Sequence, residues 1–126
     1  MMEPWFTPDS ARRVLPQVRP AAERMCRLLQ LLEACKPRGV GADQPVSAPY
    51  FTLLEAFHRA LAELRALGVR VQDPRQGLLD FPARRAGRDV LLCWRVGEPT
   101  LAYWRDALGA VRRPLDEDGP WDAPVG

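Results

Sequence analysis

Arginine and aromatic side chains crowd one short stretch of the chain. Residues 91–105 read LLCWRVGEPTLAYWR and hold two of the four tryptophans, a tyrosine, two arginines and one glutamate. Guanidinium groups bind phosphate oxygens, and aromatic rings stack on unpaired bases, so this composition is typical of an RNA-binding surface. We predict that ligand-binding side chains lie in this stretch and in the turn before it. They are Arg88, Arg95, Glu98, Tyr103, Trp104 and Arg105.

Further arginines flank this stretch. Arg84 and Arg85 precede it in the same turn as Arg88, and Arg112 and Arg113 follow it. If these turns meet at one edge of a sheet, the four form a basic patch beside the aromatic residues. The alternative is an arginine-rich surface whose hairpin is held by its own ion pairs.

Residues for metal, cofactor or nucleophilic chemistry are sparse. His58 is the only histidine, and the three cysteines have no C-x-x-C spacing, so we expect no metal site. Ser10 and Ser47 lie at predicted helix starts, where capping explains them. No phosphate loop is present, because the GVG at 39–41 lacks a flanking strand and a following lysine. We therefore expect no cofactor and no catalytic residue.

The charge is divided unevenly along the chain. The first 115 residues hold 18 basic and 12 acidic side chains, whereas the last 11 hold four acidic side chains and no basic one. We expect one domain at 1–115 and an acidic tail at 116–126. A basic body suits an anionic partner, and an acidic tail can occupy the same surface in its absence.

The first half of the chain predicts two helices. Residues 7–10 (TPDS) combine a hydroxyl N-cap with proline in the first turn. Pro16 removes a backbone donor, so we expect a short first helix that is kinked or broken near Pro16, followed by an amphipathic helix to about Cys35. Residues 37–49 are rich in proline and glycine and predict a loop, and a second helix should then end at Gly68.

The second half of the chain changes to a period of two. Strands are expected at 69–72, 78–81, 89–96 and 101–105. They must be antiparallel, because no helix long enough for a crossover separates them. The predicted fold is α+β, with an N-terminal helical hairpin packed on a small antiparallel β-meander of three to four strands.

The turn at Gly97 decides which side chains share a face of the sheet. A loop with an even number of residues places Trp94 opposite Tyr103, and Cys93 opposite Trp104. An odd loop shifts the pairing by one residue and reverses the match. Both alternatives remain open at this point.

The face that carries Arg95 is expected to be the outer one. There its guanidinium would stack on Trp104 as a cation–π pair. Glu98 lies in the turn, and we expect it to pair with Arg95 or Arg105.

Several stretches of the sequence resemble those of one protein family. FTP and LP near the start, GVRVQDPRQGLLDFPA in the middle and GRDVLLCWRVGEP later are similar to domain of unknown function 2203, a prokaryotic family with no assigned activity. The resemblance covers residues 6 to about 115 and implies the fold, but it offers no reaction to inherit. The family pattern continues YWH, whereas this chain reads Tyr103-Trp104-Arg105, so any role of that histidine is lost here.

The start of the chain has no basic leader before an apolar run, and its longest apolar run, residues 90–94, is far below a membrane span. We therefore expect a cytoplasmic protein without a membrane partner. The predicted function is a binding or interaction module for RNA or another anionic macromolecule, through the arginine and aromatic hairpin face.

Two alternatives come from other classes of protein. By analogy of fold alone, a metal-independent RelE-like endoribonuclease would use Arg88, Arg95, Glu98, Tyr103 and Arg105. Glu98 would then accept a proton, and the arginines would stabilise charge on the phosphate. A protein–protein adaptor would act as a homo-oligomer through a helix face or an open sheet edge.

Overall fold

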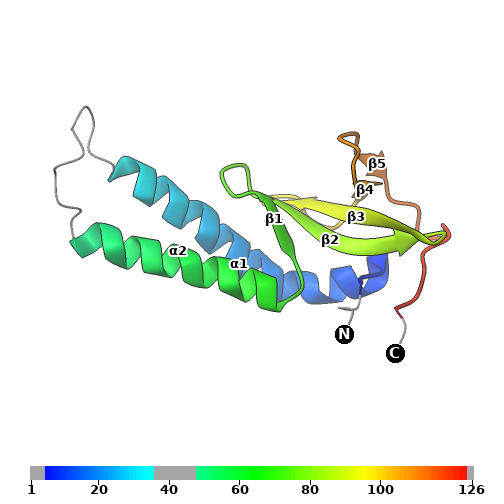
Figure 1. Ribbon diagram of the computed structural model, residues 1–126, viewed down its shortest axis with the longest axis horizontal. Coiled ribbons are helices and arrows are strands. Elements are labelled where there is room, and N and C mark those ends of the chain that lie inside the picture. The colour runs from blue at the N-terminus through cyan, green and yellow to red at the C-terminus, as the bar shows by residue number, and fades with distance from the viewer. Residues whose placement is uncertain (1–4, 36–47, 125–126) are drawn as a thin grey trace.

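The computed structural model describes residues 5–35 and 48–124. Its elements are α1 (Pro8–Ala34), α2 (Ala48–Ala66), β1 (Arg70–Asp73), β2 (Leu78–Arg85), β3 (Arg88–Arg95), β4 (Tyr103–Asp106) and β5 (Arg113–Pro114). The strands form one antiparallel sheet in the order β1-β2-β3-β4-β5 (Figure 1). The α+β class is confirmed, and a fifth, two-residue strand extends the predicted meander. Most of the loop predicted at 37–49 lies outside the described residues.

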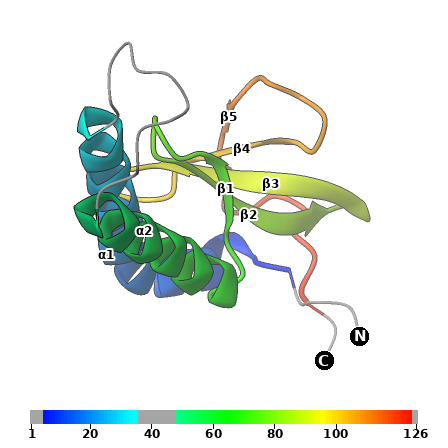
Figure 2. The same ribbon diagram turned by 60° about the vertical axis from the view of Figure 1, so that its left-hand side comes forward.

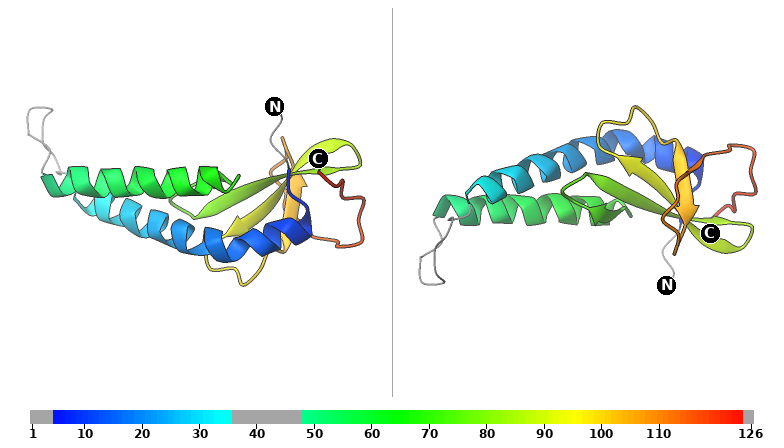
Figure 3. Two further views of the ribbon diagram at one scale, coloured as in Figure 1. Left: turned by 90° about the horizontal axis from the view of Figure 1, so that it is seen from below. Right: turned by 90° about the horizontal axis from the view of Figure 1, so that it is seen from above.

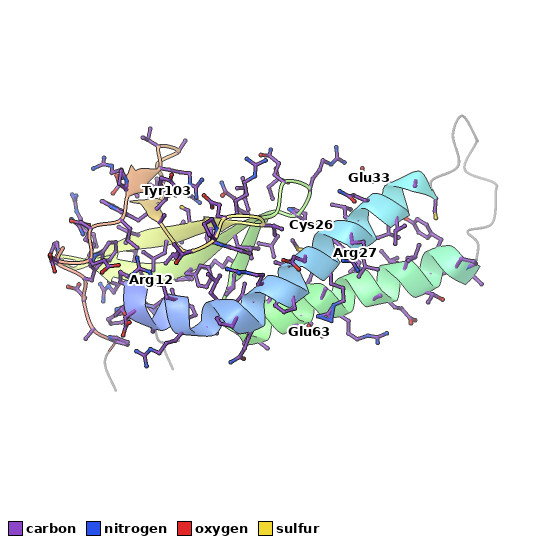
Figure 4. The ribbon with its side chains drawn as sticks, turned by 180° about the vertical axis from the view of Figure 1, so that it is seen from behind. Arg12, Cys26, Arg27, Glu33, Glu63 and Tyr103 are labelled. Atoms are coloured by element: carbon purple, nitrogen blue, oxygen red, sulfur yellow. The ribbon has the colours of Figure 1, made fainter. Side chains whose placement is uncertain are left out.

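Helix α1 begins as predicted but is not short. Thr7 and Ser10 form a capping box, in which the Thr7 hydroxyl accepts a hydrogen bond from the Ser10 amide at 3.1 Å. The helix then runs unbroken for 27 residues, so the short first helix and the break near Pro16 are wrong. The other alternative was a kink, and the helix does bend, as Figures 1 and 4 show. Pro16 and Pro20 are exposed and one turn apart, which places both missing N–H donors on the solvent side of the curve.

The core lies between one face of the sheet and the two helices. Phe81, Leu92 and Trp94 on that face are fully or almost fully buried together with Val18 and Met25 of α1. Figure 3 shows α1 running beneath the sheet. Helix α2 packs along α1 and contributes further residues to the same apolar cluster. No helix among the described residues is long and apolar enough to span a membrane.

The pairing of β3 with β4 follows the odd alternative. Cys93 lies opposite Tyr103, and Leu92 lies opposite Trp104. Side chains of directly paired residues share a face, so Trp104 joins the buried side with Leu92, and Tyr103 joins the outer side with Cys93. Figure 4 shows Tyr103 on the side of the sheet away from α1.

The opposite face of the sheet, here called the outer face, carries no helix among the described residues (Figures 1 and 2). A row of side chains crosses this face through all five strands, because the pairing joins Arg70 to Asp80, Asp80 to Cys93, Cys93 to Tyr103 and Tyr103 to Pro114. The outer face is therefore where polar side chains of the sheet meet.

The acidic tail packs against the body of the protein. Its described part, 116–124, lies along the end of the β2–β3 hairpin, where the Ala86 amide donates to the Pro120 carbonyl at 2.9 Å. Asp122 accepts a hydrogen bond from the Gly87 amide at 2.7 Å, and its carbonyl accepts one from the Trp5 indole at 2.8 Å. We call residues 116–122 the strap.

Candidate anion-binding face of the sheet

Arg105 is held by a buried carboxylate of another strand. Its Nη2 lies 2.7 Å from Oδ2 of Asp80, and its Nη1 donates to the Gly109 carbonyl at 2.8 Å. Asp80 is only 5% exposed, which is rare for an aspartate unless it is paired. Arg105 therefore neutralises the charge of Asp80 on the outer face.

Glu98 is held by Arg112. Its Oε1 accepts hydrogen bonds from Arg112 Nη2 at 2.9 Å and from the backbone amide of Arg95 at 2.6 Å. The guanidinium of Arg112 also lies 4.1 Å from the centre of the Tyr103 ring. The predicted pairing of Glu98 with the Arg95 or Arg105 side chain is wrong, because the chain after β4 returns and places Arg112 over the outer face.

Cys93 lies in the same polar group. Burial, and then the nearby charge of Asp80, raise the pKa of the Cys93 thiol to about 11, although Arg105 and Arg112 oppose the shift. A thiol with so high a pKa stays protonated near neutral pH, and the thiol is a much weaker nucleophile than the thiolate. Cys93 is therefore a structural residue of this face.

One predicted and two unpredicted arginines of this region have no acidic partner among the described residues. Arg95 and Arg70 are exposed on the outer face, and neither has an acidic partner among the described residues. Arg70 and Arg65 also line an open groove of about 850 Å³, whose walls include Trp5 and Arg84. Arg65 likewise forms no ion pair with any described residue.

The groove adds an aromatic surface to this charge. The Arg84 guanidinium lies 5.0 Å from the centre of the Trp5 ring, and Arg84 pairs with Asp89 at 3.4 Å. The outer face and groove together carry six arginines and four carboxylates. The arginines are Arg65, Arg70, Arg84, Arg95, Arg105 and Arg112, and the carboxylates are Asp73, Asp80, Asp89 and Glu98.

The remaining predicted residues lie on the other side of the hairpin. Successive residues of a strand point to opposite faces, so Arg85 is separated from Arg84, and Trp104 is separated from Tyr103. The predicted stack of Arg95 on Trp104 is therefore wrong. Arg85 and Arg113 lie over the Trp104 ring instead, at 4.8 and 5.3 Å from its centre. The predicted basic patch is thus divided between two sites.

A family model described as "Uncharacterized conserved protein (DUF2203)" matches residues 5–115. The chain belongs to the DUF2203 family. The match confirms the resemblance found in the sequence and spans Trp5, both helices and all five strands. No curated protein and no solved structure matches this chain.

Several residues of this candidate site were missed in the sequence, namely Trp5, Arg65, Arg70, Asp73, Asp80 and Asp89. Asp80 interrupts an apolar run, LLDF, and a carboxylate in such a run is a signal for a buried ion pair. Arg70 and Trp5 gave no such signal, because the groove that they line joins segments far apart in the chain. Across residues 5–35 and 48–124, no group of three or more His, Cys, Asp or Glu side chains is placed to hold a metal ion.

Proposed function

We propose that this DUF2203 protein binds single-stranded RNA in the cytoplasm, across the outer face of its sheet and the adjoining groove. The observation that carries the proposal is the excess of arginine over carboxylate on a sheet face that no described helix covers. Arg65, Arg70 and Arg95 are the arginines of this surface that have no acidic partner among the described residues. Phosphate groups of an extended strand would replace the missing acidic partners.

The aromatic groups favour an unpaired strand over a duplex. Tyr103 lies on the outer face and Trp5 lines the groove, and each has an arginine over its ring. Single-stranded nucleic acids are bound by aromatic side chains on which bases stack, beside a positively charged track for the backbone. A duplex keeps its bases stacked on one another and would leave these rings unused.

Binding is favoured over cleavage by the contacts of Glu98. The one carboxylate that was a candidate proton acceptor already receives two hydrogen bonds at Oε1, from Arg112 and from the Arg95 amide. A carboxylate held in this way serves as a brace for the β3–β4 turn, so we propose a binder that leaves the RNA intact.

The test is a fluorescence titration with a short single-stranded RNA at low and at physiological salt. Affinity should fall with salt, with a log–log slope of about −0.7 for each phosphate neutralised. The double variant Arg70→Gln/Arg95→Gln should weaken binding and make the slope shallower by roughly 1 to 1.5.

The matched control is Arg27→Gln/Arg59→Gln. Both arginines are exposed on the helices and have no acidic partner in the described structure, so the control removes the same charge from another surface. It should bind RNA almost as the wild type does. Equal loss in both double variants, or no binding at low salt, would refute the proposal. A gel of the titrated RNA that showed cleavage abolished by Glu98→Gln would replace the binder with a nuclease.

A further inference from the structure

Arg85 lies against two indole rings that meet edge to face, and it pairs with a carboxylate of its own chain. Its guanidinium carbon lies 4.8 Å from the centres of both the Trp104 and Trp121 rings. Its two terminal nitrogens donate to the two oxygens of Asp116 at 2.9 and 2.8 Å. The Arg85 side chain is 19% exposed, so its surroundings keep most water away from the guanidinium.

A small pocket of about 230 Å³ adjoins Arg85. Three arginines line it, Arg85, Arg88 and Arg113, together with Trp104 and a single acid, Asp106. Asp106 approaches Arg113 only to 3.5 Å. Arg88 is exposed and has no acidic partner among the described residues. The pocket is therefore positively charged even while Asp116 holds Arg85.

We propose that this pocket is a second anion-binding site, specific for a phosphate group. When no ligand is bound, the Asp116 carboxylate occupies the Arg85 guanidinium in the place of the phosphate. The pocket lies on the opposite side of the β2–β3 hairpin from the outer face, so it goes beyond the proposed RNA-binding surface. Its natural ligand would carry a terminal phosphate.

The chemistry of the site favours phosphate over carboxylate. A guanidinium fork accepts either group through two parallel hydrogen bonds. A phosphate brings a further oxygen and up to one more negative charge, which Arg88 and Arg113 can take up, whereas Asp116 satisfies Arg85 alone. The ligand therefore neutralises more of the pocket than the side chain that it displaces.

The exchange does not require the strap to leave. Half of the Asp116 side chain is exposed, and an ion pair with an exposed partner contributes little net stability. The strap is also fixed by contacts that do not involve this carboxylate: Trp121 packs edge-on against Trp104, and Asp122 accepts from the Gly87 amide. Asp116 can thus turn away while the strap stays docked.

The experiment is a titration of the full-length protein with inorganic phosphate, at constant ionic strength set with chloride, followed by tryptophan fluorescence. Trp104 and Trp121 contact Arg85 and should report its change of partner. Asp116→Asn removes the competing charge and should tighten phosphate binding about three- to tenfold. Asp118→Asn is the matched control, because this exposed acid of the strap has no ion pair in the described structure.

Arg88→Gln is the second variant and keeps the test independent of the strap. It should weaken phosphate binding severalfold without changing the melting temperature. The proposal is overturned if Asp118→Asn tightens binding as much as Asp116→Asn, or if Arg88→Gln has no effect. Arg70→Gln/Arg95→Gln should bind phosphate normally, so loss of RNA binding in that variant with phosphate binding retained separates the two sites.

Discussion

Arg105 and Asp80 join β4 to β2 across the strand between them, with 2.7 Å between their charged atoms. Arg105 lies opposite Leu91 of β3, and Asp80 lies opposite Cys93, so the ion pair runs diagonally over β3. The pair thus ties three strands together on the face that lacks a helix.

Breaking this pair should be costly. Arg105→Met would leave the Asp80 charge buried and unpaired, and we expect a loss of about 3–5 kcal/mol in the free energy of unfolding, measured with urea. The double variant Asp80→Leu/Arg105→Met should recover much of the loss, because neither charge remains. Arg13→Gln, which removes an exposed pair with Asp9, should cost about 0.5 kcal/mol or less. A similar small cost for Arg105→Met would show that Asp80 is not dependent on its partner.

The three cysteines should react in order of their exposure. Cys35 is exposed, Cys26 is half-buried and Cys93 is buried, and burial raises the pKa of both Cys26 and Cys93. At pH 8 iodoacetamide should label Cys35 first, Cys26 slowly and Cys93 only on unfolding, as peptide mass spectrometry would show. Rapid labelling of Cys93 in the native protein would contradict the burial of this face.

Cys93 should also make stability depend on pH in the alkaline range. Its thiol has a pKa of about 11 in the folded protein, against 9.0 as the ordinary value, so the native state holds the proton more tightly than the unfolded state. The stabilisation is complete below pH 9 and is lost as the pH rises toward 11. Urea denaturation should show a steeper fall over this interval in the wild type than in Cys93→Ala. Parallel curves would mean that the thiol is more accessible than the structure shows.

The contact between Asp116 and Arg85 should depend on pH in the acid range, and it should be lost as the pH falls. Hydrogen bonds from Arg85 lower the pKa of its carboxyl, so the unfolded state binds this proton more readily. The contact is complete above the ordinary carboxyl value of about 4 and is lost as the pH falls through the folded pKa. Tryptophan fluorescence should change over that acid interval in the wild type and stay flat in Asp116→Asn. The same transition in both proteins would assign it to another carboxyl group.

Gly77 should tolerate no side chain. Its φ is +69°, and a Cβ atom would lie 2.8 Å from Val96 Cγ2 and 3.1 Å from the Cys26 sulfur. Gly87 has a similar φ of +77°, but no atom lies within 4 Å of such a Cβ. Gly87→Ala therefore measures the cost of the positive φ alone. Gly87→Ala should cost about 1–2 kcal/mol, and Gly77→Ala at least about 1 kcal/mol more, because the clash is added. Equal melting temperatures for the two variants would refute the close packing at Gly77.

The sequence was sufficient for the parts of the fold that depend on local pattern. The N-cap at Thr7, the glycine expected to end the second helix at Gly68 and the period of two that follows it each predicted the element that forms there. The choice between a kink and a break at Pro16 also has a local cause. Two exposed prolines one turn apart are accommodated in a curved helix, so the helix bends and does not break.

The site was predicted less well because its geometry is not local. The parity of the loop before Tyr103 decides which ring is buried, and spacing left both parities open. Glu98 pairs with Arg112 because the chain after β4 returns to the turn between β3 and β4, and the order of the residues does not show this return. The arginines near the hairpin were predicted as one group, whereas the folded chain divides them between two sides of the sheet and pairs them with Asp80, Asp89, Glu98, Asp106 and Asp116.

The odd count of residues between Cys93 and Tyr103 has an evolutionary consequence. Gain or loss of one codon in the segment 96–102 would exchange the two neighbouring rings, burying the Tyr103 hydroxyl against the apolar core and turning the Trp104 indole outward. Gain or loss of two codons would keep each ring on its present side. Insertions and deletions in this hairpin should therefore be retained in steps of two residues.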